Sequence, residues 1–82
     1  MKINEKITWT AKNNSSFLNG ERSAKTILGA VRAAIKYGNG ELCGEGAITI
    51  MQDGYPVRYY EAGLLAGTAA GTWIRTDDRR GM

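Results

Sequence analysis

Apolar and polar residues alternate along the first part of the chain. In residues 3–11 the side chains of Ile3, Ile7, Trp9 and Ala11 fall on one side of an extended backbone, with polar side chains on the other. A period of two residues is typical of a strand with one buried face. The pattern therefore predicts a strand here, followed by a polar loop in which Phe17 and Leu18 pack against the core.

The period changes to that of a helix over residues 21–37. One side of the helical wheel carries the apolar residues Ala24, Ile27, Leu28, Val31, Ala34 and Ile35. Such a stripe predicts an amphipathic helix with one face on the core. Asn19 or Ser23 is expected to cap its start, and Gly38 is expected to end it in the left-handed conformation.

Two further strands, over residues 47–52 and 55–62, flank Asp53-Gly54. This dipeptide is favoured in two-residue hairpins because both of its residues tolerate positive φ. Proline lacks an N–H, so Pro56 predicts that its strand begins at a sheet edge or a bulge.

A regular register for this hairpin determines which side chains share a face. With Gln52 opposite Tyr55, Ile50 lies opposite Val57 and Ile48 opposite Tyr59. The other face is then expected to hold Thr49, Met51, Arg58 and Tyr60.

A short last strand is predicted over residues 72–76, with Trp73 and Ile74 on opposite faces. The order is strand, helix, strand, strand, strand. This order predicts an α+β fold of two layers, in which one helix packs on an antiparallel sheet of about four strands. We expect residues 1–76 to form a single domain and residues 77–82 to be a polar tail.

The glycine-rich stretch GLLAGTAAG, residues 63–71, raises the question of a phosphate site. A P-loop needs a lysine followed by serine or threonine, and a dinucleotide fingerprint needs a different glycine spacing before a helix. Neither pattern is present, so we expect a connection between two strands. Leu64 and Leu65 are expected either to cover the edge of the core or to form an exposed apolar tip.

Composition narrows the chemistry that the chain can perform. The 82 residues include no histidine and one cysteine, Cys43, which we interpret as a small, half-buried structural residue. Zinc sites and the usual nucleophilic triads depend on histidine, and the carboxylates are scattered. We expect no catalytic residues, no metal and no cofactor. The longest stretch without charge, residues 62–74, is shorter than the roughly 20 apolar residues that span a bilayer. The charged first ten residues do not resemble a signal peptide. We therefore expect a cytoplasmic protein without membrane contact.

Charge is distributed unevenly along the chain. Residues 1–40 carry a net charge of +5 and residues 41–82 a net charge of −2. In the predicted helix Arg22, Lys25, Arg32 and Lys36 lie within about 80° of one another on the wheel. This basic row is either a solvated helix face or a docking surface for phosphates or an acidic protein. On the sheet, Arg58 and Tyr60 suit base stacking or a protein interface equally well.

The layout of residues 3–76 resembles that of the small proteins that bacteriophages use against host defences, including several anti-CRISPR proteins. The segments that carry this layout are KITWTAK, SAKTILGAVRAAIKYG and AITIMQDGYPVRYYEA. The resemblance implies a non-enzymatic inhibitor that binds a larger host protein or ribonucleoprotein complex and blocks its nucleic-acid or nuclease site. The contact residues would be Arg22, Lys25, Arg32, Lys36, Arg58 and Tyr60.

Two alternatives stay open at this point. The basic helix could instead belong to a small nucleic-acid-binding module, which steep salt dependence would reveal. The chain could also pair with itself through the edge at Pro56 or through Leu64-Leu65, which would give a homo-oligomer.

Overall fold

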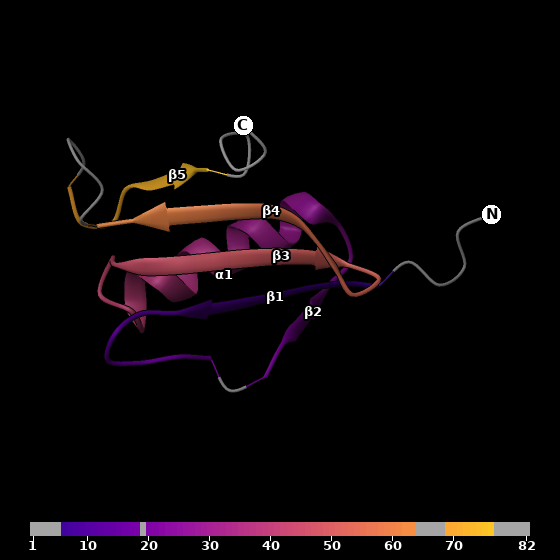
Figure 1. Ribbon diagram of the computed structural model, residues 1–82, viewed down its shortest axis with the longest axis horizontal. Coiled ribbons are helices and arrows are strands. Elements are labelled where there is room, and N and C mark those ends of the chain that lie inside the picture. The colour runs from indigo at the N-terminus through magenta and orange to yellow at the C-terminus, as the bar shows by residue number, and fades with distance from the viewer. Residues whose placement is uncertain (1–5, 19, 64–68, 77–82) are drawn as a thin grey trace.

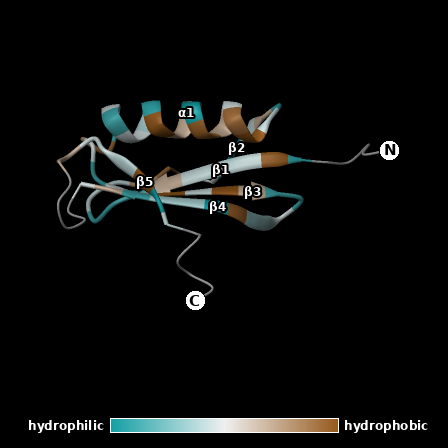
Figure 2. Ribbon diagram, turned by 90° about the horizontal axis from the view of Figure 1, so that it is seen from above, coloured by the Kyte–Doolittle hydropathy of each residue, from teal (hydrophilic) through white to brown (hydrophobic). Residues whose placement is uncertain are grey.

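The protein folds into two layers, a helix and a sheet. The computed structural model describes residues 6–18, 20–63 and 69–76. Its elements in chain order are β1 (Ile7–Lys12), β2 (Arg22–Ala24), α1 (Ile27–Gly40), β3 (Gly46–Gln52), β4 (Tyr55–Ala62) and β5 (Trp73–Arg75). Figure 1 shows the helix behind the sheet, and Figure 2 shows it lying across one sheet face. The opposite face carries no other described element.

The sheet has five strands in the order β2-β1-β3-β4-β5, and every neighbouring pair is antiparallel. The predicted α+β fold and its order of elements are therefore confirmed, with β2 as one additional short strand. The predicted C-terminal tail, residues 77–82, lies outside the described residues.

The core lies between α1 and the central strands. Leu42, Ile48 and Ile50 are fully buried, and the helix contributes Ala30 and Ala34 with no exposed surface. Small helical side chains let the helix approach the sheet closely, so that the larger side chains of the strands fill the space between the layers. The predicted inward face of the first strand is confirmed for Ile7, Trp9 and Ala11, which are all buried, whereas Ile3 lies outside the described residues.

The helix begins six residues later than the sequence pattern predicted. Arg22 and Ala24 pair with Trp9 and Ile7 of β1, so this segment is a strand rather than a helical turn. Thr26 is the N-cap: its backbone is extended, and its hydroxyl oxygen accepts a hydrogen bond from the Gly29 N–H at 2.9 Å. The expectation that Asn19 or Ser23 caps the helix is wrong, because the helix begins at Ile27. Thr26, directly before it, satisfies an N–H of the first turn instead.

The helix also ends later than predicted. It continues through Gly38 to Gly40, and Gly38 is helical rather than left-handed. The indole of Trp73 covers Gly38, where a Cβ would overlap ring atom Cζ2. The same indole donates from Nε1 to Oδ1 of Asn39 at 2.8 Å. Glycine is needed here for close packing of β5 against the helix, not for a turn.

The β3–β4 hairpin forms as predicted at Asp53-Gly54, which have φ angles of 55° and 87°. Its predicted register is wrong beyond the first two pairs. Met51 pairs with Pro56 as expected, but a shift between Ile50 and Met51 leaves Val57 as an extra residue. Arg58 therefore pairs with Ile50, and this bulge, one of the two alternatives that Pro56 left open, moves every later residue by one position.

The loop after β1 is organised by Asn13. Its Oδ1 accepts hydrogen bonds from the N–H groups of Ser15 and Ser16, and its Nδ2 donates to the carbonyl of Leu42 at 3.0 Å. Leu18 is buried as predicted, but the expectation for Phe17 is wrong, since its side chain is 68% exposed.

The glycine-rich stretch joins β4 to β5. Within its described part, Gly71 donates its N–H to the carbonyl of Gly44 at 2.7 Å, which fixes this end to the turn after α1. Leu64 and Leu65 lie outside the described residues.

Cys43 lies in the turn after α1. It is exposed and has a φ angle of 58°, so its predicted half-buried position is wrong.

Candidate binding surface on the helix

The side of α1 that faces away from the sheet presents basic and apolar residues together. We call this surface the outer face and define it by its exposed residues Lys25, Leu28, Arg32, Ala33 and Lys36. Buried positions on the opposite side of the helix, such as Ala30 and Ala34, fix the orientation of the helix. The outer face is therefore a consequence of how α1 packs on the sheet.

Two of the predicted contact residues, Arg32 and Lys36, lie one helical turn apart on the outer face. Residues four apart are neighbours on a helix surface, about 6 Å apart along the axis. Residues 22–40 contain no carboxylate, so the helix itself offers these cations no partner. Two neighbouring like charges on a helix are mildly destabilising, and an acidic partner would relieve this repulsion.

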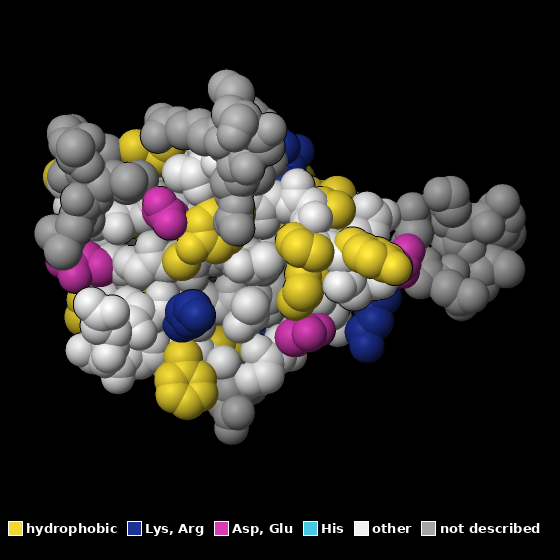
Figure 3. Space-filling view, in the orientation of Figure 1, with side chains coloured by type: hydrophobic (Ala, Val, Ile, Leu, Met, Phe, Trp, Pro, Cys, Tyr) yellow, Lys and Arg dark blue, Asp and Glu magenta, His cyan; other side chains and the backbone are white. Residues whose placement is uncertain are grey.

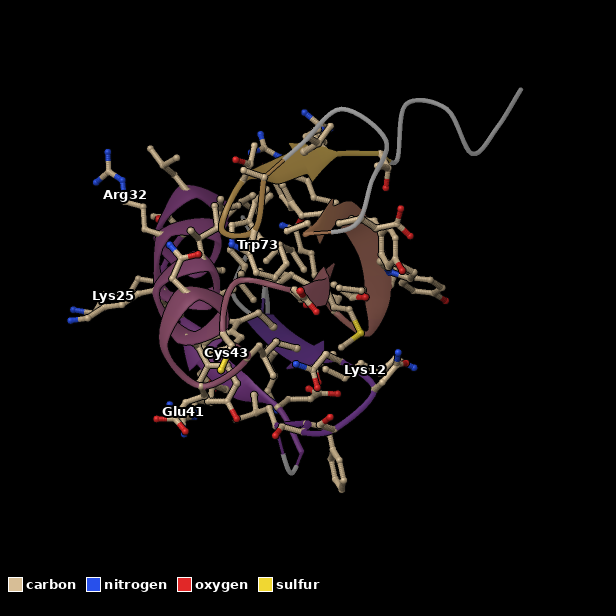
Figure 4. The ribbon with its side chains drawn as sticks, turned by 90° about the vertical axis from the view of Figure 1, so that its left-hand side faces the viewer. Lys12, Lys25, Arg32, Glu41, Cys43 and Trp73 are labelled. Carbon is tan, nitrogen blue, oxygen red and sulfur yellow. The ribbon has the colours of Figure 1, made fainter. Side chains whose placement is uncertain are left out.

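Lys25 extends the basic surface past the start of the helix. It is exposed and lies just before the N-cap Thr26, in a bend rather than on the predicted helix. Figure 4 shows the side chains of Lys25 and Arg32 both pointing away from the sheet on the helix side of the molecule. The structure thus keeps these two predicted residues on one surface.

Leu28 is an apolar component of the outer face that the sequence did not reveal. The helical wheel assigned it to the buried stripe, but its side chain is 53% exposed. It lies about 40° from Arg32 on the wheel, beyond the edge of the stripe centred on Ala30, Val31 and Ala34. A later helix start, signalled by Thr26, would have placed Leu28 in the first turn, where fewer neighbours cover it.

Arg22 occupies a different position from the other predicted basic residues. On β2 its guanidinium lies over the rings of Trp9 and Tyr37, at 5.8 and 5.4 Å from their centroids. The two rings meet edge to face with centroids 5.7 Å apart. This cation–π stack connects the edge strand to the helix, which gives Arg22 a structural role.

The two predicted contact residues on the sheet do not join this surface. Tyr60 pairs with Ile48 and is 9% exposed. It therefore belongs to the core, and its side chain lacks the exposure that a contact residue needs. Arg58 is half-buried and pairs with Ile50. The bulge at Val57 is the physical reason, because it reverses the faces that a regular register assigns.

The opposite face of the sheet has a mixed character. Figure 3 shows acidic, basic and hydrophobic side chains interspersed over its visible part. At one end an open depression is lined by charged, amide and small residues, namely Lys12, Asn13, Asn14, Ser15, Glu45, Gly46, Ala47, Glu61 and Ala62. The Asn13 amide is already hydrogen-bonded to its own loop and to the Leu42 carbonyl. Lys12 lies together with two carboxylates, so no charge of one sign dominates this depression.

Two further features of the described residues concern metal binding and membrane insertion. No three of their cysteine and carboxylate side chains gather in a group that could hold a metal ion. Within the same residues, no helix has the length and apolarity needed to cross a membrane.

Comparisons with protein-family models, with curated proteins and with solved structures found no match to this chain. The outer face therefore has to be interpreted from its own chemistry.

Proposed function

We propose that this protein is a non-enzymatic binding protein that attaches to a larger protein or ribonucleoprotein complex through the outer face of α1. The observation that carries the proposal is the composition of that face, which combines three exposed cations with a half-exposed leucine. Arginine is enriched among the residues that contribute most to the affinity of protein interfaces, and an exposed apolar side chain beside it gains free energy when a partner buries it.

The layout resemblance to small phage anti-defence proteins suggests what such binding could achieve. A protein of this size can inhibit a larger assembly by occupying a functional surface, without chemistry of its own. In that case the target would be a bacterial defence complex, and the outer face would cover its nucleic-acid or nuclease site.

Capture of a partner from bacterial lysate tests the proposal. The tagged protein is compared with Arg32→Glu/Lys36→Glu and with the matched control Lys6→Glu/Lys12→Glu, which makes the same change in charge at exposed lysines of the sheet layer. Each capture is done with and without nuclease, at low and high salt. We expect a stoichiometric protein partner that survives nuclease, is lost in the helix variant and is retained by the control.

Other outcomes would contradict the proposal. Recovery of nucleic acid alone, vanishing at high salt, would assign the basic helix to phosphate binding, because counterion release makes that binding strongly salt-dependent. Equal loss of the partner in both variants would show that net charge matters and that the outer face does not.

A further inference from the structure

The chemistry of the outer face also indicates what kind of surface it binds. Leu28, Arg32 and Lys36 follow one another at four-residue steps, so each is displaced by about 40° from the last. They form a continuous row that begins at an apolar side chain and continues as two cations. Ala33, exposed beside this row, keeps its neighbourhood flat.

The helix also carries no side chain near the outer face at its C-terminal end, because residue 40 is a glycine. At Gly40 a Cβ would meet no described atom within 4 Å, and the residue does not have positive φ. The described fold therefore does not require glycine there, although glycine has a lower helix propensity than alanine. A side chain is absent where a partner would approach.

A nucleic-acid backbone would use only part of this surface. Phosphates would pair with Arg32 and Lys36, but a sugar-phosphate chain offers no apolar side chain to cover Leu28. A protein segment that carries carboxylates next to an apolar side chain complements all three positions of the row. Charge complementarity and the exposed leucine thus favour the same class of partner.

We infer that the outer face docks an acidic amphipathic segment of a partner protein, whose carboxylates pair with Arg32 and Lys36 and whose apolar side chain covers Leu28. This inference rests on the proposed function and makes it more specific. It identifies the contacted surface of the partner as protein even where the whole complex also contains nucleic acid.

Site-specific photo-crosslinking tests the inference. A benzophenone amino acid replaces Ala33 on the outer face or, as a control, Phe17, which is an exposed aromatic residue in the loop after β1. Each protein is irradiated in bacterial lysate, and mass spectrometry identifies the crosslinked peptide or nucleotide. The expected result is a crosslink from position 33, absent from position 17, to a carboxylate-rich peptide in which an apolar side chain lies next to the carboxylates.

The identified peptide is then synthesised and its affinity measured. We expect Arg32→Glu/Lys36→Glu to weaken its binding at least about tenfold, with Lys6→Glu/Lys12→Glu within about twofold of wild type.

The remaining outcomes separate the inference from the proposed function. A crosslink from position 33 to nucleic acid or to an uncharged segment would overturn the inference while leaving a binding function. A crosslink from position 17 alone would move the interface to another surface, and would overturn both the inference and the proposed attachment through the outer face. No crosslink from either position would contradict both.

Discussion

Gly38 and Gly40 are two helical glycines near the end of α1, and their surroundings differ. The indole of Trp73 lies directly over Gly38, whereas the described structure leaves the space at Gly40 open. The same residue type thus serves close packing at one position and leaves a bare surface at the other.

Alanine at these two positions should change stability in opposite directions. Gly38→Ala places a methyl group against Trp73 and is expected to lower the free energy of unfolding by about 1–3 kcal/mol. Gly40→Ala adds only helix propensity and is expected to raise it by about 0.5–1 kcal/mol. Urea unfolding of both variants measures the difference, and a Gly38→Ala protein as stable as wild type would show that Trp73 does not pack on the helix.

Among the secondary-structure elements, the side chain of Arg22 links the edge strand β2 to both β1 and α1. β2 is three residues long and pairs only with β1 among the described strands. Arg22 adds a contact outside the sheet, because its guanidinium lies over both Trp9 and Tyr37. The edge strand, the sheet and the helix meet at this stack.

Replacing Arg22 tests whether the cation–π stack contributes to the free energy of unfolding. Arg22→Ala is expected to lower the free energy of unfolding by about 1 kcal/mol, since it removes an exposed cation–π contact and exposes the aromatic rings. Arg22→Lys keeps the charge but loses the planar group, so its stability should lie between the two. If urea unfolding gave the same midpoint for all three proteins, the stack would contribute nothing to the fold.

Local patterns predicted most of these elements because their determinants lie close together in the sequence. The inward face of the first strand follows from strict alternation, and the hairpin follows from Asp53-Gly54. The start of the helix did not follow, because residues 22–24 fit a helical period but pair with β1, a contact formed by residues far apart in sequence. The hairpin register was wrong for a related reason: Pro56 indicated either a sheet edge or a bulge, and the sequence specified neither which of the two forms nor which residue would be extra.

The candidate surface was predicted only in part. Arg32 and Lys36 are on the helix and exposed, as the wheel indicated, and Lys25 lies just before it. Arg22 is not part of the surface, because its segment forms β2 instead of a helical turn. Tyr60 lies in the core, because the bulge at Val57 places it opposite Ile48. Leu28 was missed because helical periodicity places it at the edge of the apolar stripe, where tertiary packing decides whether it is covered.

At the scale of the whole molecule, the two layers differ in chemical character. The helix layer presents three exposed cations with no carboxylate between residues 22 and 40, and the exposed Glu41 follows only at the C-cap of α1, on the helix side of the molecule (Figure 4). The open sheet face mixes both signs along its visible part (Figure 3). A predominantly basic surface attracts acidic partners and speeds their association. Contact between the partner and the exposed side chain of Leu28 would add an apolar component to this charge attraction.

The measurement that tests this account most directly is partner capture by a Leu28→Lys variant. The change removes the apolar side chain, adds a positive charge and keeps helix propensity nearly unchanged. We expect the variant to fold with near wild-type stability, because Leu28 is 53% exposed, and to capture clearly less partner. Equal or stronger capture would contradict it and would show that the outer face acts through positive charge alone.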